Sequence, residues 1–232
     1  MPPTYWLVMP AAGKGERMGT AGTAVPKQYQ PLAGRAVIEH ALAPFLADPG
    51  CLGVIVALAP GDTAFRRLSL AADPRVTAVT GGAERADSVR AGLVAVETRV
   101  GAADPWVLVH DAARPCLPPA DLARLLAALA EAPDGALLAF PITDTLKRAD
   151  EAGRSVATLP RARLWRAATP QAFRLRRLLA ALAAQPAATD EASAVEAAGG
   201  RPRLVAGSPG NLKLTTPADV ELAACILAGE RP

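Results

Sequence analysis

Near its N-terminus the chain passes from an apolar run into a loop of small and basic residues, L-V-M-P-A-A-G-K-G-E-R-M-G (7–19), which is followed by P-K-Q (26–28). Backbone N–H groups at Gly13 and Gly15 can close on a phosphate because no side chain stands in the way, and Lys14, Arg17 and Lys27 can neutralise its charge. Such a loop after a buried strand is how an α/β protein holds a nucleotide triphosphate. A plain glycine-rich turn with solvated cations is the alternative.

The spelling of this loop excludes two common phosphate-binding motifs. It does not end in Gly-Lys-Ser or Gly-Lys-Thr, so it is not a P-loop. Its glycines, at positions 13, 15 and 19, also miss the G-x-G-x-x-G spacing of dinucleotide-binding proteins. Both of these protein classes are therefore set aside.

The composition fits an enzyme built as one domain. The 232 residues are enough to bury a large core, and we expect a single domain spanning residues 1–232. Hydrophobic residues make up 51% of the chain, but no apolar run reaches the ~18 residues of a membrane helix, and the sequence shows no secretory signal. The net charge of +3 is spread along the chain, which suits anionic small molecules better than nucleic acid. We therefore expect a cytoplasmic protein that binds neither membranes nor nucleic acid.

The three cysteines, Cys51, Cys116 and Cys225, are isolated in the sequence and lack metal-ligand spacing. Their odd number and isolation predict buried thiols in a reducing compartment. A cysteine nucleophile paired with His40 or His110 is disfavoured, because nothing in the sequence places these residues together.

Apolar strand patterns and amphipathic helix patterns alternate along the first 140 residues. Strands are predicted at 6–9, 52–59, 76–80, 106–109 and 136–140, and helices at 36–47, 62–70, 86–96 and 119–132. This alternation predicts a doubly wound α/β fold, with a mostly parallel sheet and helices on both faces. In such sheets ligands bind beyond the carboxyl ends of the strands.

The alternation breaks at about residues 141–171, where we expect a protruding β-hairpin arm. Its strands are predicted at 142–149 and 155–159, around a turn at 150–153. An isolated two-stranded hairpin is marginally stable in water, so it should pack on the parent domain or on a second subunit. After the arm the pattern predicts helices at 170–185 and 190–198, strands at 203–206 and 211–215, and a helix from Thr216-Pro217.

Three further polar clusters follow predicted strands. The loop through Gly82 to Ser88 can meet a flat ring edge-on and hydrogen-bond a base, or it can be a plain strand-to-helix turn. Asp111 can hold Mg²⁺, which prefers oxygen ligands and is often shared with phosphates, or it can cap a helix. Lys213 can serve the same site or be a solvated lysine. Each cluster alone is weak, but we expect all of them to meet at one rim of the sheet.

Eight short blocks occur in order along the chain: P-A-A-G-K-G-E-R-M (10–18), P-K-Q-Y (26–29), G-G-A-E-R-A-D-S-V (81–89), V-H-D-A-A-R-P (109–115), D-T-L-K-R (144–148), T-P-Q-A-F (169–173), T-D-E-A-S (189–193) and N-L-K-L-T (211–215). In these blocks the chain closely resembles the 2-C-methyl-D-erythritol 4-phosphate cytidylyltransferase family of the non-mevalonate isoprenoid pathway. The resemblance implies a Rossmann-like nucleotidyltransferase fold, transfer of CMP from CTP to methylerythritol phosphate, dependence on Mg²⁺ or another divalent cation, and a homodimer. In the family, the hairpin arm of each subunit reaches over the active site of the other.

The resemblance also assigns roles to individual residues. The residues matched to the CTP site are Pro10, Ala11, Ala12, Gly13, Gly15, Gly82, Ser88, Asp111 and Ala112. The residues matched to catalysis are Arg17, Lys27 and Lys213. The residues matched to the sugar-phosphate site are Arg114, Thr145, Arg161, Thr169 and Thr189, of which Thr145 and Arg161 would come from the partner's arm. Asp111 is matched to the metal, directly or indirectly.

Two other functions remain open from the sequence. A ribitol-5-phosphate cytidylyltransferase would have the same fold and reaction with a different polyol phosphate. A catalytically silent CTP-binding regulatory protein would keep the nucleotide site alone. The presence of Arg17, Lys27, Asp111 and Lys213 argues against this second alternative.

Overall fold

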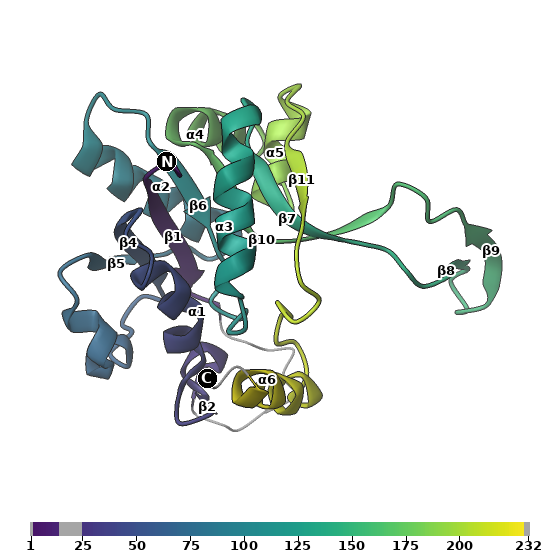
Figure 1. Ribbon diagram of the computed structural model, residues 1–232, viewed down its shortest axis with the longest axis horizontal. Helices are drawn as coiled ribbons and strands as arrows, with labels where there is room; N and C mark the ends of the chain where they lie inside the picture. Colours follow the sequence, from purple (N-terminus) through teal and green to yellow (C-terminus); the bar gives the residue numbers. More distant parts are fainter. Residues whose placement is uncertain (1, 14–24, 230–232) are drawn as a thin grey trace.

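The computed structural model describes residues 2–13 and 25–229. Seven of the described strands form one sheet in the order β11-β7-β10-β6-β1-β4-β5 (Figure 1). The strands are β1 (Tyr5–Ala11), β4 (Cys51–Leu58), β5 (Val76–Thr80), β6 (Trp106–Val109), β7 (Ala136–Pro141), β10 (Trp165–Arg174) and β11 (Arg203–Ala206). Neighbouring strands pair in parallel except around β10, which runs antiparallel to both β6 and β7. The prediction of a mostly parallel sheet is confirmed.

Helices cover both faces of this sheet, because its central strands are apolar on both sides. On β1, Leu7 and Met9 pack into the core beneath α1 (Val37–Leu46) and α3 (Pro119–Ala128). Val8 points the other way, into the core beneath α2 (Arg85–Val100), α4 (Leu175–Ala184) and α5 (Glu191–Ala197). The last helix, α6 (Pro217–Gly229), packs on a smaller apolar cluster beside the short hairpin β2 (Pro31–Leu32) and β3 (Arg35–Ala36).

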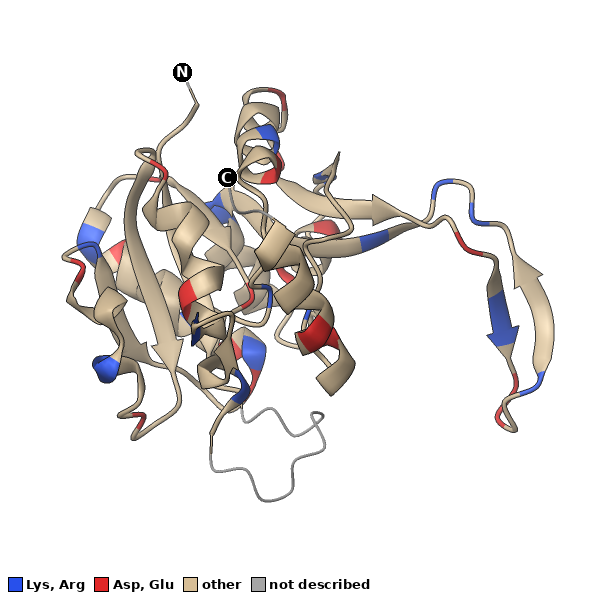
Figure 2. Ribbon diagram, turned by 60° about the horizontal axis from the view of Figure 1, so that its bottom comes forward, with Lys and Arg blue, Asp and Glu red and all other residues tan. Residues whose placement is uncertain are grey.

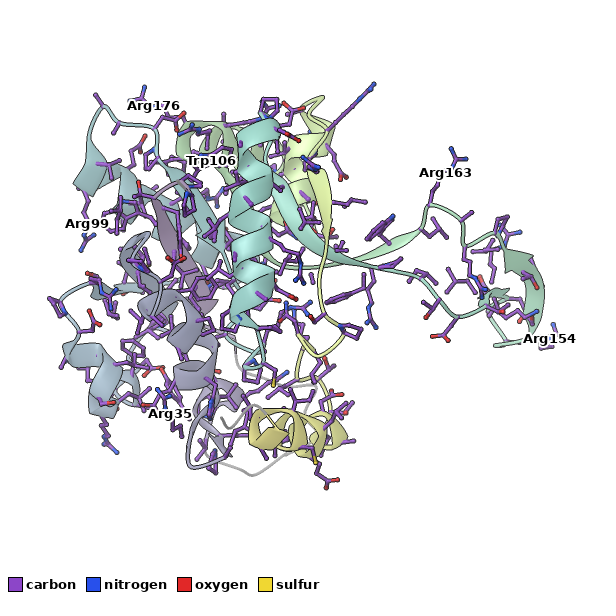
Figure 3. The ribbon with its side chains drawn as sticks, viewed as in Figure 1. Arg35, Arg99, Trp106, Arg154, Arg163 and Arg176 are labelled. Carbon is purple, nitrogen blue, oxygen red and sulfur yellow. The ribbon has the colours of Figure 1, made fainter. Side chains whose placement is uncertain are left out.

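The arm is formed by β8 (Leu146–Ala149) and β9 (Ser155–Leu159), which pair antiparallel with each other. It leaves the body between β7 and β10 and projects far from it (Figure 1). Large apolar side chains on and beside it are exposed: Val156, Leu159, Leu164 and Trp165. Basic residues recur along it (Figure 2), and Arg154 and Arg163 point outward from it (Figure 3).

Three predicted elements are wrong. Residues 165–174 form strand β10, so the helix expected from 170 begins only at Leu175. Residues 211–215 are not a strand, because their contact with the sheet side of the molecule is one bond from the Leu214 amide to the Ala113 carbonyl, at 2.8 Å. The helix expected at 62–70 is replaced by two short 3₁₀ helices, η3 (Phe65–Arg67) and η4 (Ser69–Ala72).

The cysteines differ in burial, which corrects one further expectation. Cys51 and Cys116 are buried as predicted, but Cys225 is exposed on α6, and none of the three forms a disulfide. α6 covers its apolar cluster with one side, so the position of Cys225 on the helix leaves its thiol outside. In the described part of the chain, no helix is both long and apolar enough to cross a bilayer.

Candidate active site

A cavity of about 210 Å³ opens beyond the carboxyl ends of β1, β5 and β6. The segments that line it are the end of β1, the short 3₁₀ helix η2 (Lys27–Tyr29), the loop from β5 into α2, the loop after β6, and the segment before α6. Ten residues expected at the site line this cavity: Pro10, Ala11, Ala12, Gly13, Lys27, Gly82, Ser88, Asp111, Ala112 and Lys213. Gly15 and Arg17 lie outside the described residues.

Asp111 is the charged centre of this cavity. Its carboxylate follows β6, and Arg85 Nε donates to Oδ1 at 3.0 Å. On the other oxygen, Lys213 Nζ lies 2.9 Å and Arg114 Nε 3.7 Å from Oδ2. Burial opposes the ionisation of Asp111, but Arg85 and Lys213 outweigh it and hold the pKa of this carboxyl well below its usual range. Asp111 is therefore an anion at neutral pH.

Arg85 is held from behind by a second, deeper carboxylate. Its two terminal nitrogens donate to the two oxygens of Glu191, at 2.6 and 3.1 Å, and the side chain of Glu191 is 1% exposed. Burial raises the pKa of Glu191, although its pairing with Arg85 acts against that shift. A bidentate arginine–carboxylate pair fixes the guanidinium plane, so Arg85 presents Nε to Asp111 in one orientation.

The phosphate side of the cavity is built by the loop after β1. Gln28 is buried, and its Nε2 donates to the carbonyl of Ala11 at 2.8 Å. This bond ties η2 to the end of β1 and brings Lys27 to the cavity wall. The described part of the loop thus places the small residues Ala12 and Gly13 opposite a lysine, as anion binding requires.

The opposite wall is made by Gly81, Gly82 and the first turn of α2. The hydroxyl of Ser88 accepts from the Gly82 amide at 3.2 Å and donates to the Glu84 carbonyl, also at 3.2 Å. A Cβ atom on Gly82 would collide with the side chain of Asp87, and one on Gly81 would lie 2.7 Å from Ser88 Oγ. The glycines are therefore needed for close packing against α2.

The residues expected at the sugar-phosphate site fall into three places. Arg114 and Thr169 are buried beside Asp111, and the Asp111 amide donates to Thr169 Oγ1 at 3.1 Å. Thr189 lines a neighbouring cavity of about 300 Å³, which shares Glu84 and Arg85 with the first. Thr145 and Arg161 are exposed on the arm and do not line the cavity of their own chain.

His110 lies beneath the site and is completely buried. Burial lowers its pKa from 6.5 to about 4, so the ring is neutral at neutral pH. Its ring centroid is 5.1 Å from that of Phe45. Sequence reasoning considered it as a partner for a cysteine nucleophile, but its ring nitrogens face Thr169 and the Arg114 carbonyl instead.

The lowered pKa of His110 predicts that folding stability falls in mild acid. Between pH about 6.5 and about 4 the unfolded chain binds a proton that the folded chain excludes. The contribution is fully present above pH 6.5 and is lost as the pH falls, by at most about 1.4 kcal/mol per pH unit for one proton. Urea unfolding across this range should show the loss in the wild type and a shallower slope in His110→Gln. Equal slopes in the two proteins would contradict this prediction.

Sequence reasoning missed three residues that hold the site together: Gln28, Arg85 and Glu191. Each stands inside a block quoted for the family resemblance, but outside the positions matched to ligands. Arg85 and Glu191 are 106 residues apart and meet because α2 and α5 lie on the same face of the sheet. The available signal was a lone arginine and a lone glutamate, each at the first residue of a helix.

Comparison with known proteins agrees with this geometry. Residues 5–229 match the family model described as 2-C-methyl-D-erythritol 4-phosphate cytidylyltransferase. The chain belongs to this family.

Proteins of that name from two bacteria are similar over nearly the whole chain. The one from Ectopseudomonas mendocina is 52% identical over 93% of this chain and 92% of its own length. The one from Pseudomonas putida KT2440 is 48% identical over 99% and 98%. Solved structures share the fold. A 4-diphosphocytidyl-2C-methyl-D-erythritol synthase gives a TM-score of 0.85 at 39% identity, covering 98% of this chain and 100% of that one. The Thermus thermophilus cytidylyltransferase gives 0.78 at 31%, with the same coverage. The fold is therefore the α/β nucleotidyltransferase fold of this family.

Proposed function

We propose that the protein transfers CMP from CTP to 2-C-methyl-D-erythritol 4-phosphate, giving 4-diphosphocytidyl-2-C-methyl-D-erythritol and pyrophosphate. The observation that carries this proposal is the cavity in which Lys27, Lys213 and Asp111 face the Gly82–Ser88 wall. One side of the cavity suits a triphosphate and the other suits a flat base. Family membership over residues 5–229 supports the same reaction.

The reaction is an in-line displacement at the α-phosphorus of CTP. A phosphate oxygen of the sugar phosphate attacks, and pyrophosphate leaves. Because the attacking group is already an anion, no strong general base is needed. The barrier comes from bringing two anions together and from charge that builds on the phosphate oxygens, which preorganised cations relieve. A cavity with lysines and no nucleophilic serine or cysteine fits this chemistry.

Each part of the cavity then has a task. Lys27 and Lys213 stabilise charge at the phosphates, together with Arg17, which lies outside the described residues. Ser88, Gly82 and the end of β1 surround the nucleotide. Arg114 is suited to the sugar phosphate, because its Nε is buried without a hydrogen-bond partner among the described residues and can donate to an anion.

A divalent cation fits this donor set. In the described part of the chain no group of three or more His, Cys, Asp or Glu side chains could hold a metal by itself. Mg²⁺, however, commonly takes one or two carboxylates and completes its shell with substrate phosphates and water. Asp111 is ionised and faces the cavity, so it is the residue that would hold the ion. When bound, Mg²⁺ would neutralise charge on the phosphates.

We also propose a homodimer in which each arm completes the other subunit's site. An exposed hairpin with Val156, Leu159 and Trp165 at its surface is unstable alone and gains by packing on a second copy. Thr145 and Arg161 would then approach the partner's sugar phosphate. A reducing compartment suits the three unpaired thiols, so the expected place of work is the cytoplasm.

The proposed reaction is tested by pyrophosphate release from purified protein with Mg²⁺. CTP with methylerythritol phosphate should give turnover well above ATP, UTP or GTP with the same acceptor. Ribitol 5-phosphate should replace methylerythritol phosphate poorly. Faster turnover with ribitol phosphate would favour the alternative acceptor, and CTP binding without any turnover would favour the regulatory protein.

A further inference from the structure

The proposed mechanism leaves one buried polar side chain at the site without a task, that of His110. Its Nε2 lies 3.1 Å from the carbonyl oxygen of Arg114, across the loop that follows β6. Its Nδ1 lies 3.0 Å from the hydroxyl oxygen of Thr169, at the bend of β10. The ring therefore joins two segments that both border Asp111.

The chemistry of these partners fixes the direction of every hydrogen bond. A carbonyl oxygen can only accept, so His110 Nε2 carries the ring hydrogen and donates it to Arg114. Nδ1 of the neutral ring is then an acceptor, and Thr169 must donate its single hydroxyl hydrogen to it. The same hydroxyl accepts from the Asp111 amide at 3.1 Å. Asp111 thus donates to Thr169, which donates to His110, which donates to Arg114.

Two more bonds extend this chain to the segment that carries Lys213. Asn211 is fully buried, and its Nδ2 donates to the Thr169 carbonyl at 2.9 Å. The Asn211 carbonyl in turn accepts from Arg114 Nη1 at 2.8 Å. The loop after β6, the bend of β10 and the segment before Lys213 are therefore locked to one another beneath the cavity.

We propose that His110 is a positioning residue of the active site, which as the Nε2–H tautomer commits the Thr169 hydroxyl to the interior and so orients Asp111 and Arg114. Thr169 then serves the sugar-phosphate site through the placement of Asp111 rather than by donating to the substrate. This inference rests on the proposed function for its kinetic consequences only, since the hydrogen-bond chain itself needs no substrate.

The tautomer can be observed directly, because the chain has only two histidines. Nitrogen NMR of untagged, ¹⁵N-histidine-labelled protein is recorded without ligands, and His40→Gln assigns the two rings. We expect a protonated Nε2 and an unprotonated Nδ1 in His110, an altered Nδ1 resonance in Thr169→Val, and its recovery in Thr169→Ser. A protonated Nδ1, or an Nδ1 resonance that ignores Thr169→Val, overturns the proposal whatever reaction the enzyme catalyses.

A kinetic cycle then tests whether His110 acts through Thr169. His110→Gln keeps a donor for Arg114 but loses the acceptor for Thr169, whereas His110→Asn can place Oδ1 where Nδ1 was. We expect His110→Gln and Thr169→Val each to lower kcat about tenfold with little change in KM for CTP, as loss of a supporting contact does. The double variant should be no slower than the slower single one, and His110→Asn should regain part of the activity.

Two results would overturn this assignment even if all variants fold, as thermal melting would verify. Multiplying effects in the double variant would show that Thr169 reaches the substrate independently of His110. Wild-type kcat in His110→Gln would show that the chain of bonds does not position the site. His40→Gln serves as the matched control, because His40 Nε2 also faces a carbonyl, that of Leu32, but His40 does not line the cavity.

Discussion

Replacing Lys213 by alanine should lower turnover at least a hundredfold, which is the order expected for loss of one preorganised charge contact. The ammonium group lies 2.9 Å from Asp111 Oδ2 at the cavity wall, and its side chain is still 42% exposed, so it can turn to a phosphate. Asp111 would keep Arg85 and Arg114 as partners in the variant, so the cavity should retain its carboxylate. The loss would therefore fall on the reaction more than on the structure.

The measurement is pyrophosphate release over a range of CTP concentrations. CTP binding should weaken less than kcat falls, because charge at the α-phosphate grows toward the transition state. Lys27→Ala should behave alike. Arg99→Ala is the matched control, since it removes one positive charge from the end of α2, away from the cavity (Figure 3). Near-normal turnover in Lys213→Ala would remove this lysine from the catalytic set.

The parallel half of the fold was predictable because its strands are buried on both faces. Such strands read as continuous apolar runs, and β4 and β6 are examples whose position in the sequence is plain. β10 was missed for a physical reason. Its buried segment pairs with β6 and β7, which no local pattern records, and Thr169-Pro170 followed by alanine and leucine resembles a helix start. Tertiary pairing overrode local propensity there.

The candidate site shows the same division. Convergence of the loops after β1, β5 and β6 follows from parallel strands ending at one rim, so the cavity could be expected from sequence. The pairing of Arg85 with Glu191 could not, because it depends on two helices meeting across 106 residues. Thr145 and Arg161 were assigned by resemblance alone, and the described chain places them on the arm, outside its own cavity.

That placement makes the second large effect a recovery of activity. If the arm serves the partner's site, Arg161→Ala and Lys27→Ala homodimers should each be nearly inactive, and a mixed dimer should work. One of its sites would carry both lesions and the other neither, so by two-fold symmetry up to about half of its sites could turn over. The two variants would be co-expressed with different affinity tags, the mixed dimer isolated through both, and its pyrophosphate release compared with that of the parents.

A second pair of variants separates a shared site from a general benefit of mixing. Lys27 and Lys213 line the same cavity of one chain, so a mixed dimer of Lys27→Ala and Lys213→Ala leaves one lesion in every site and should stay inactive. Recovery in the first pair and none in the second requires that Arg161 cross between subunits while the lysines do not. An inactive first pair with demonstrated subunit exchange, or a fully active monomer, would instead mean that each chain completes its own site, and the exposed arm would then need another reason to project from the body.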